Sequence, residues 1–239
     1  MAFAEKVLWV VNFNSLDWLT GRAQAAKATA VAIRTDNSFD PAIKKFHDLG
    51  IKVYGWRWPS AYRKRALEQA EAVVKLMNKG LDGFIADPEG EPGASYDWNQ
   101  DGLEDLAEVF CETITAPHPG KLFGTTSHYR ARKLFKKLPW AQFFRYSTRF
   151  LPQPYWRVAG GVVNHGKPDE NYRDGMSAWK GTGAPENQIV PMAGEIDKVT
   201  PEEIAKHAAA ANAAGVKELH FYTATGSVKK EVWEAISKL

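Results

Sequence analysis

Three carboxylate side chains stand close together directly after a short apolar run, in the segment from Gly83 to Glu91. The segment reads Gly-Phe-Ile-Ala-Asp-Pro-Glu-Gly-Glu, so the acids are Asp87, Glu89 and Glu91. Alternate residues of a strand point to one face, which predicts that Asp87 and Glu89 lie side by side if the strand continues through Pro88. Carboxyl groups placed in this way can act as general acid and general base. The alternative interpretation is an acidic loop in solvent.

A fourth acid, Glu195, follows another apolar run, in the sequence Met-Ala-Gly-Glu-Ile-Asp. Hydrolysis of a glycosidic bond uses one carboxyl group to protonate the leaving oxygen and a second to attack the sugar or to activate water. We therefore predict Glu89, Asp87 and Glu195 as catalytic residues. The alternative role of Glu195 is ordinary helix-start chemistry ahead of Thr200.

Aromatic residues are frequent near these acids, and nine Trp, eight Tyr and twelve Phe leave some for a surface or a cleft. Sugar rings present flat apolar faces to aromatic side chains, so the aromatic residues after two of the apolar runs are expected to form a carbohydrate platform. The alternative is that they seal the rim of the fold. The residues predicted to bind substrate are Trp56, Arg57, Trp58, Tyr96, Trp98, Tyr129, Arg145, Tyr146 and Tyr222.

Eight apolar, β-branched runs alternate with helical patterns along the chain, an arrangement typical of parallel strands covered by helices. The runs begin near Val7, Ala30, Lys52, Gly83, Lys121, Phe143, Ile189 and Glu218. We predict a (β/α)8 TIM barrel, α/β in class, that forms a single domain over residues 1–239, with the acids at the carboxyl ends of its strands. A doubly wound open sheet is the alternative, although no Gly-rich nucleotide-binding motif supports it.

Local signals mark several boundaries of these elements. Gly50, Gly80 and Gly215 each stand between a helical pattern and an apolar run, where a left-handed helix cap is expected. Thr200 begins the sequence Thr-Pro-Glu-Glu, which predicts a capping box. The segment after the sixth run extends to about Asn187, and a connection of that length is typical of a functional loop.

Composition excludes several classes of function. The formal net charge is only +3 and the basic residues are dispersed, which argues against nucleic acid but permits attraction to an anionic polymer. One cysteine, Cys111, allows neither a disulfide framework nor a thiolate metal site within the chain. His128 and His165 are isolated, without the spacing of metal ligands, so neither a metal nor another cofactor is expected.

The amino-terminal residues lack the pattern of a signal peptide, and no segment reaches membrane-spanning length. We expect synthesis in the cytoplasm, with release by lysis or by a dedicated export system, and no insertion into a membrane. The sequence does not determine an oligomeric state.

The acidic segment from Asp87 to Gly93 resembles the Asp-x-Glu signature on the fourth strand of the phage and bacterial muramidases of glycoside hydrolase family 25. The resemblance implies a barrel that cuts peptidoglycan glycan strands, with Glu89 as the catalytic acid and Asp87 in support. The family carries an Asp at the end of its first strand, where this chain has Asn12 and Asn14. A second resemblance, to barrel glycosidases with acids on strands four and seven, matches Glu89 and Glu195.

The sequence therefore predicts a glycoside hydrolase that cleaves a polysaccharide, with peptidoglycan as the first candidate. One alternative is a non-catalytic carbohydrate-binding barrel that has lost a catalytic partner. Another is a barrel hydrolase or isomerase in which Asp87, Glu89, Glu91 and Glu195 bind a divalent cation.

Overall fold

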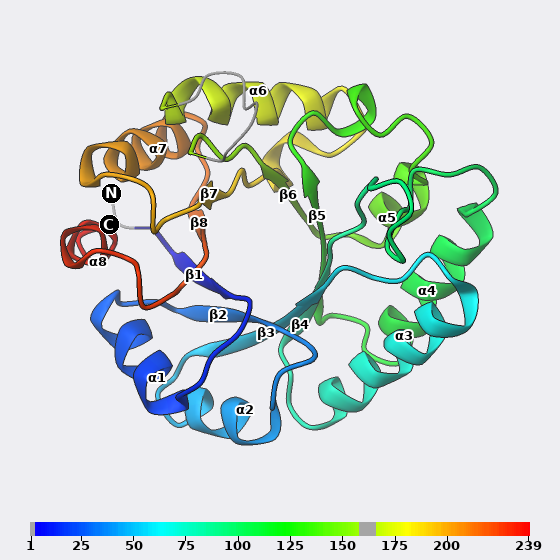
Figure 1. Ribbon diagram of the computed structural model, residues 1–239, viewed down its shortest axis with the longest axis horizontal. Helices are drawn as coiled ribbons and strands as arrows, with labels where there is room; N and C mark the ends of the chain where they lie inside the picture. Colours follow the sequence, from blue (N-terminus) through cyan, green and yellow to red (C-terminus); the bar gives the residue numbers. More distant parts are fainter. Residues whose placement is uncertain (1–2, 158–165) are drawn as a thin grey trace.

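The computed structural model describes residues 3–157 and 166–239, and in this part of the chain strands and helices alternate. The strands are β1 (Glu5–Val10), β2 (Ala30–Arg34), β3 (Lys52–Arg57), β4 (Gly83–Ala86), β5 (Leu122–His128), β6 (Arg149–Gln153), β7 (Ala193–Gly194) and β8 (Glu218–Tyr222). The α-helices are α1 (Leu16–Ala25), α2 (Asp40–His47), α3 (Arg63–Asn78), α4 (Glu104–Thr115), α5 (Trp140–Tyr146), α6 (Pro168–Lys180), α7 (Pro201–Ala213) and α8 (Lys230–Ser237). Two short 3₁₀ helices cover Ala131–Lys133 and Glu186–Gln188. Figure 1 shows the helices as an outer ring around the strands.

The strands form one parallel sheet in the order β6-β5-β4-β3-β2-β1-β8-β7. The two ends of the sheet meet, because Ile189 bridges to Phe150 in parallel, and the amides of Val190 and Met192 donate to the carbonyls of Phe150 and Pro152 at 2.8 and 2.9 Å. Eight βα units closed in this way are a TIM barrel, as the sequence predicts.

The strands are buried on both faces, as expected of a parallel sheet covered by helices. Every residue of β4 is buried, and so are most residues of β1 and β2. The packing between β4 and β5 is close at Gly83, where an added Cβ would lie 2.6 Å from the carbonyl oxygen of Leu122. The absence of a side chain there lets β4 lie against β5 directly below the acidic segment.

The predicted helix boundaries are confirmed. Gly50, Gly80 and Gly215 have φ angles of 70°, 110° and 73°, in the left-handed region that favours glycine. Thr200 and Glu203 form the reciprocal hydrogen bonds of a capping box at the start of α7.

The prediction of a strand near Phe143 is wrong. Phe143 lies in α5, where it is fully buried against Trp98 and Phe110, and the sixth strand begins six residues later at Arg149. A run with several aromatic residues fits the pattern of a buried strand and that of a buried helix face equally well. The contact of Phe143 with Phe110 of α4 stabilises the helix.

The connection after the sixth strand is shorter than predicted, because α6 fills Pro168–Lys180. The middle of the predicted functional loop, including His165, lies outside the described residues. The seventh strand has only Ala193 and Gly194, and Ile189, where it was expected to begin, makes the bridge that closes the barrel.

Candidate active site

A cavity of about 130 Å³ opens at the carboxyl ends of the strands. Its walls come from six strands or the residues that directly follow them, so it lies at the mouth of the barrel. The lining residues are Trp9, Trp58, Asp87, Gln153, Tyr155, Glu195 and Tyr222.

The backbone of the acidic segment is anchored at each of its three positions. The amide of Asp87 donates to the carbonyl of Arg57 at 2.9 Å, and the hydroxyl of Ser127 donates to the carbonyl of Pro88 at 2.7 Å. The carbonyl of Glu89 accepts from the amide of Trp98 at 2.7 Å. Strand β4 ends at Ala86, so these contacts with β3, β5 and the following loop, rather than a continued ladder, hold the acids in place.

The carboxyl groups of Asp87 and Glu89 hydrogen bond to each other. A carboxylate has no donor, so this bond requires a proton held between the two groups. Burial raises the pKa of Asp87 to about 7, against hydrogen bonds with Glu89, Gln153 and Trp58 that lower it. Burial, followed by the charge of Asp87, also raises the pKa of Glu89 well above its usual range. The pair therefore holds a proton near neutral pH.

Asp87 is the deeper member of this pair. Its side chain is only 3% exposed, and Gln153 Nε2 donates to its Oδ1 at 3.0 Å and to Thr126 Oγ1 at 3.1 Å. Glu89 is half-buried and so is the member with access to a ligand.

Two tyrosines form one wall of the cavity. The rings of Tyr155 and Tyr222 stack with their centres 5.3 Å apart and their planes 12° apart. Gly194 makes room for this wall, because a Cβ added there would lie 2.7 Å from the Tyr155 ring. Glu195 follows directly, with its carboxylate paired with Lys198.

Trp9 is held from below by a chain of buried hydrogen bonds. Its Nε1 donates to His220 Nδ1 at 2.9 Å, and His220 Nε2 lies 2.6 Å from Glu218 Oε1. Because Nδ1 accepts the indole proton, Nε2 carries the proton that is donated to Glu218. Arg149 completes the chain by donating to Glu218 Oε2 at 2.7 Å.

The structure brings together several residues that the sequence singles out. Asp87, Glu195, Trp58 and Tyr222 line one cavity, and Glu89 contacts Asp87. Tyr96 stacks on Trp58 with ring centres 6.0 Å apart, so it extends the aromatic surface outward.

Other predicted binding residues lie elsewhere. Trp56 and Trp98 are fully buried, with their indole N–H groups donating to the carbonyls of Val10 and Pro59, so the prediction that they stack on sugar is wrong. Trp56 packs on Trp9 and Trp58, which line the cavity, and Trp98 bonds to the loop after β3. Arg145 and Tyr146 belong to α5, and both bind Glu108 of α4 in the outer layer, so their placement at a strand end is also wrong.

Two further predicted binding residues do not line the cavity. Arg57 donates to Thr35 at 3.3 Å. Tyr129 is buried, stacked on His128 at 4.8 Å, and accepts from Arg130. Burial lowers the pKa of His128 to about 4, so this histidine is neutral at physiological pH and does not supply a proton there.

Sequence reasoning missed three lining residues: Trp9, Gln153 and Tyr155. Trp9 lies within an apolar run whose pattern predicts a buried core strand. Gln153 and Tyr155 follow β6, and a strand started at Phe143 does not place them at its end. Placing the sixth strand at Arg149 would have identified both.

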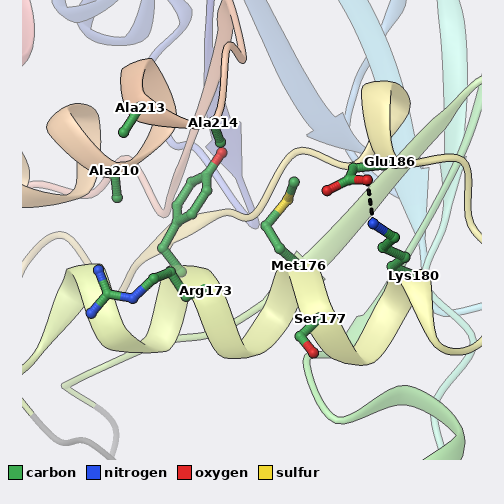
Figure 2. A pocket seen from close by; sticks show the side chains of 9 residues that line it. Arg173, Met176, Ser177, Lys180, Glu186, Ala210, Ala213 and Ala214 are labelled. Carbon is green, nitrogen blue, oxygen red and sulfur yellow. Dashed lines mark hydrogen bonds and ion pairs between the residues drawn. The ribbon is translucent and has the colours of Figure 1, made fainter.

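A larger cavity of about 440 Å³ lies between α6 and α7 on the outside of the barrel. Figure 2 shows Met176 and the small side chains of Ala210, Ala213 and Ala214 around it, with Lys180 paired to Glu186 at one end. Its charged groups are exposed and already paired, and its buried tyrosine, Tyr172, stays neutral because burial raises its pKa, so the acid pair at the mouth remains the candidate for chemistry.

Within residues 3–157 and 166–239, no group of three or more His, Cys, Asp or Glu side chains is arranged to hold a metal ion. The same part of the chain has no helix long and apolar enough to cross a membrane.

No protein-family model matches the chain, and the search of curated proteins finds no match. Solved structures do share its fold. The glycoside hydrolase domain of PgaB (BpsB) from Bordetella bronchiseptica matches with a TM-score of 0.67, at 10% identity, over 98% of each chain.

A family GH18 chitinase from Cycas revoluta matches with a TM-score of 0.64 at 10% identity, over 98% of this chain and 99% of that one. The spore cortex-lytic enzyme SleL of Bacillus megaterium matches with a TM-score of 0.64 at 8% identity, over 97% of this chain and 73% of that one.

The chain therefore has the TIM-barrel fold of glycoside hydrolases. The glycosidase class expected from the sequence is the class to which these neighbours belong. None of the three is described as a family 25 muramidase, so that narrower resemblance stays a prediction.

Proposed function

We infer that this protein hydrolyses a polysaccharide built from β-linked N-acetylhexosamines, with Glu89 as the general acid. The observation that carries the proposal is the proton-sharing pair of Asp87 and Glu89 at the mouth of the barrel, where Asp87 lines an aromatic-walled cavity and Glu89 contacts Asp87. A general acid must hold its proton at the working pH, and a carboxyl group with a raised pKa does so.

The two carboxyl groups have different roles in the proposal. Glu89 is the more accessible, so it donates its proton to the leaving oxygen as the bond from that oxygen to the sugar C1 breaks. Asp87 is held by Gln153 and Trp58, and it keeps Glu89 in place.

In the common retaining and inverting mechanisms of glycoside hydrolysis, a second carboxylate attacks the sugar or activates water. Asp87 and Glu89 cannot provide both the acid and this second carboxylate. Those mechanisms need carboxyl groups about 5–5.5 Å apart for retention or about 6.5–9.5 Å for inversion, whereas Asp87 and Glu89 hydrogen bond to each other. An N-acetylhexosamine carries its own nucleophile, the acetamido carbonyl oxygen, as in the substrate-assisted glycosidases. We assign that oxygen the attack on C1, with Asp87 accepting the acetamido N–H.

Water then opens the cyclic intermediate, and Glu89 takes the proton from that water. The sugar leaves with a free reducing end. Glu195 lines the same cavity and is the competing nucleophile. Glu195→Gln should keep most of the turnover if the acetamido oxygen attacks, and should lose it if the carboxylate does.

The names of the structural neighbours support an amino-sugar polymer. One is a chitinase and another is a spore cortex-lytic enzyme. Peptidoglycan and chitin share N-acetylglucosamine, and peptidoglycan is the substrate that also fits the muramidase resemblance. Analysis of the reducing ends released from each polymer distinguishes them.

The test is Glu89→Gln, which keeps the shape of the side chain but cannot act as an acid. We expect the release of reducing ends to fall at least about 100-fold, with glycan retention and thermal stability nearly unchanged. Glu71→Gln, on the outer helix α3, is the matched control and should keep full activity. Cleavage at the wild-type rate by Glu89→Gln would contradict the proposal.

A further inference from the structure

A second hollow of about 300 Å³ lies beside the catalytic cavity, between the loop after β1 and the loop after β8. Asn12, Asn14, Trp18 and Thr225 are the lining residues with polar or aromatic groups that suit a ligand. This set is here called the strand-one hollow. Both loops follow strands whose own residues, Trp9 and Tyr222, line the catalytic cavity. The two cavities are therefore neighbours along the same pair of strands.

The orientation of the Asn12 amide is determined by its neighbour. Arg34 Nη2 donates to Asn12 Oδ1 at 3.0 Å, and Arg34 Nε is paired with Asp36 at 2.7 Å. The amide oxygen of Asn12 must face this donor, because a guanidinium cannot accept a hydrogen bond. Its two N–H donors therefore point elsewhere, and they bond to no other described residue.

The remaining groups of the strand-one hollow also suit a sugar. Asn14 is exposed, and its amide hydrogen bonds to no other described residue. Trp18 adds aromatic surface, with the Arg22 guanidinium 5.8 Å from its ring centre holding its orientation. Amide donors beside an indole match the hydroxyl and acetamido oxygens and the apolar face of a pyranose ring.

Arg34 also links the hollow to the catalytic cavity. Besides Asn12, its guanidinium contacts Trp58, whose ring centre lies 5.7 Å away. Trp58 lines the catalytic cavity, so a single side chain holds a residue of each cavity.

The catalytic cavity is too small to bind a polysaccharide alone. Its 130 Å³ lies below the range of about 300–1,000 Å³ that ligand sites usually have. Most of the binding free energy for a glycan must then come from outside it, and the strand-one hollow more than doubles the available volume.

We propose that the strand-one hollow is a binding subsite for a distal N-acetylhexosamine ring of the same glycan chain whose scissile bond lies at Glu89. The proposal rests on the proposed function. It assigns Asn12 and Asn14 as hydrogen-bond donors to that ring, and it makes affinity depend on glycan length.

The test uses Glu89→Gln as the parent protein, so that the ligand is bound but not cut. Its affinity is measured by calorimetry for N-acetylglucosamine oligosaccharides from the disaccharide to the pentasaccharide. Asn12→Asp keeps an oxygen facing Arg34 and replaces the N–H donors by a charged oxygen, Asn12→Ala removes the same donors without adding a charge, and Asn14→Ala removes the second amide. Asn78→Ala, exposed at the end of α3 and away from the mouth of the barrel, is the matched control.

The variants at Asn12 and Asn14 should each lose about three- to tenfold in affinity for the longer oligosaccharides, the effect of one hydrogen bond, and nothing for the disaccharide. The control Asn78→Ala should keep the parent's affinity at every length. An unchanged affinity at every length, or an equal loss at every length, would overturn the subsite while leaving the proposed function intact. A parent that binds no oligosaccharide, together with a wild type that cleaves none, would overturn both proposals.

Discussion

The chemistry at the residue scale depends on the proton shared by Asp87 and Glu89. Burial is the largest cause that raises the pKa of both groups, and their mutual contact means that they titrate as a pair. Glu91 adds a further negative charge nearby, which also raises the pKa of Glu89. Because Glu91 is exposed, its contribution can be removed without opening the site.

We predict that Glu91→Gln moves the alkaline limb of the pH–rate profile to lower pH. A general acid works below its pKa and fails as the pH rises through it, and removing a negative charge lowers the pKa of Glu89. The shift should be a fraction of a pH unit, because exposed charges are screened. It is measured as kcat/KM against pH, with Glu234→Gln on α8 as the control. A limb that stays in place or moves to higher pH would show that Glu91 does not act on the acid.

At the scale of elements, aromatic residues only two positions apart have opposite environments. Trp56 lies inside β3, is fully buried, and packs on Trp9 and Trp58 with ring centres 5.4 and 5.1 Å away. Trp58 follows the strand, is half-buried, and lines the cavity. Their contributions should therefore separate into stability for Trp56 and binding for Trp58.

We predict that Trp56→Ala costs about 3–5 kcal/mol in the free energy of unfolding, the range for a large buried aromatic. Trp58→Ala should cost less stability but should raise KM for the glycan and weaken retention on insoluble polysaccharide. Urea denaturation and a pull-down assay measure the two effects. Equal loss of stability in both variants, with retention unchanged, would contradict this separation.

The chain from Trp9 through His220 to Glu218 joins β1 to β8 below the cavity. Although burial alone would raise it, the pKa of Glu218 falls to about 2 because His220 and Arg149 donate to its carboxylate. An acid whose pKa is lower in the folded state stabilises the fold above its unfolded pKa of about 4, and this stability is lost as the pH falls toward 2.

We predict that Glu218→Gln destabilises the protein by roughly 3 kcal/mol at pH 7, since it leaves Arg149 without its buried partner. The difference from wild type should shrink as the pH is lowered from about 4 toward 2, where the wild-type carboxylate is also protonated. Chemical denaturation across this range measures it. A penalty that does not vary with pH would mean that the charge of Glu218 does not stabilise the fold.

At the scale of the whole molecule, the closed barrel brings residues from six strands to one mouth. The protonation and the pairing of the acids at this mouth favour acid catalysis over a metal mechanism. Metal ligands must be deprotonated, whereas Asp87 and Glu89 share a proton. Glu195 is already paired with Lys198, and exposed Glu91 is held by Tyr96.

The single-domain organisation and the cytoplasmic synthesis expected from the sequence stay predictions.

We predict that prolonged dialysis against a chelator changes neither glycan cleavage nor the melting temperature. The control is the same protein dialysed with added Mg²⁺ or Ca²⁺, the ions that oxygen ligands prefer. Activity lost on chelation and restored by one of these ions would instead support the metal-dependent alternative.

Local patterns in the sequence determine the class of fold and the position of the acids. Seven of the eight strands begin within about four residues of their predicted starts, because β-branched runs and left-handed glycines such as Gly50 act through local conformational preferences. The Asp-Pro-Glu segment stands at the end of β4 for the same reason, since Pro88 cannot continue the ladder.

Only the tertiary structure decides which side chains share the cavity. Phe143 is helical because α5 packs on α4, and this shift moves Gln153 and Tyr155 to the end of β6 and Arg145 to the outside. Trp9 becomes part of the site through His220, a residue 211 positions away. Burial, the largest cause that raises the pKa of Asp87 and of Glu89, also arises only when the barrel closes, so no local pattern specifies it.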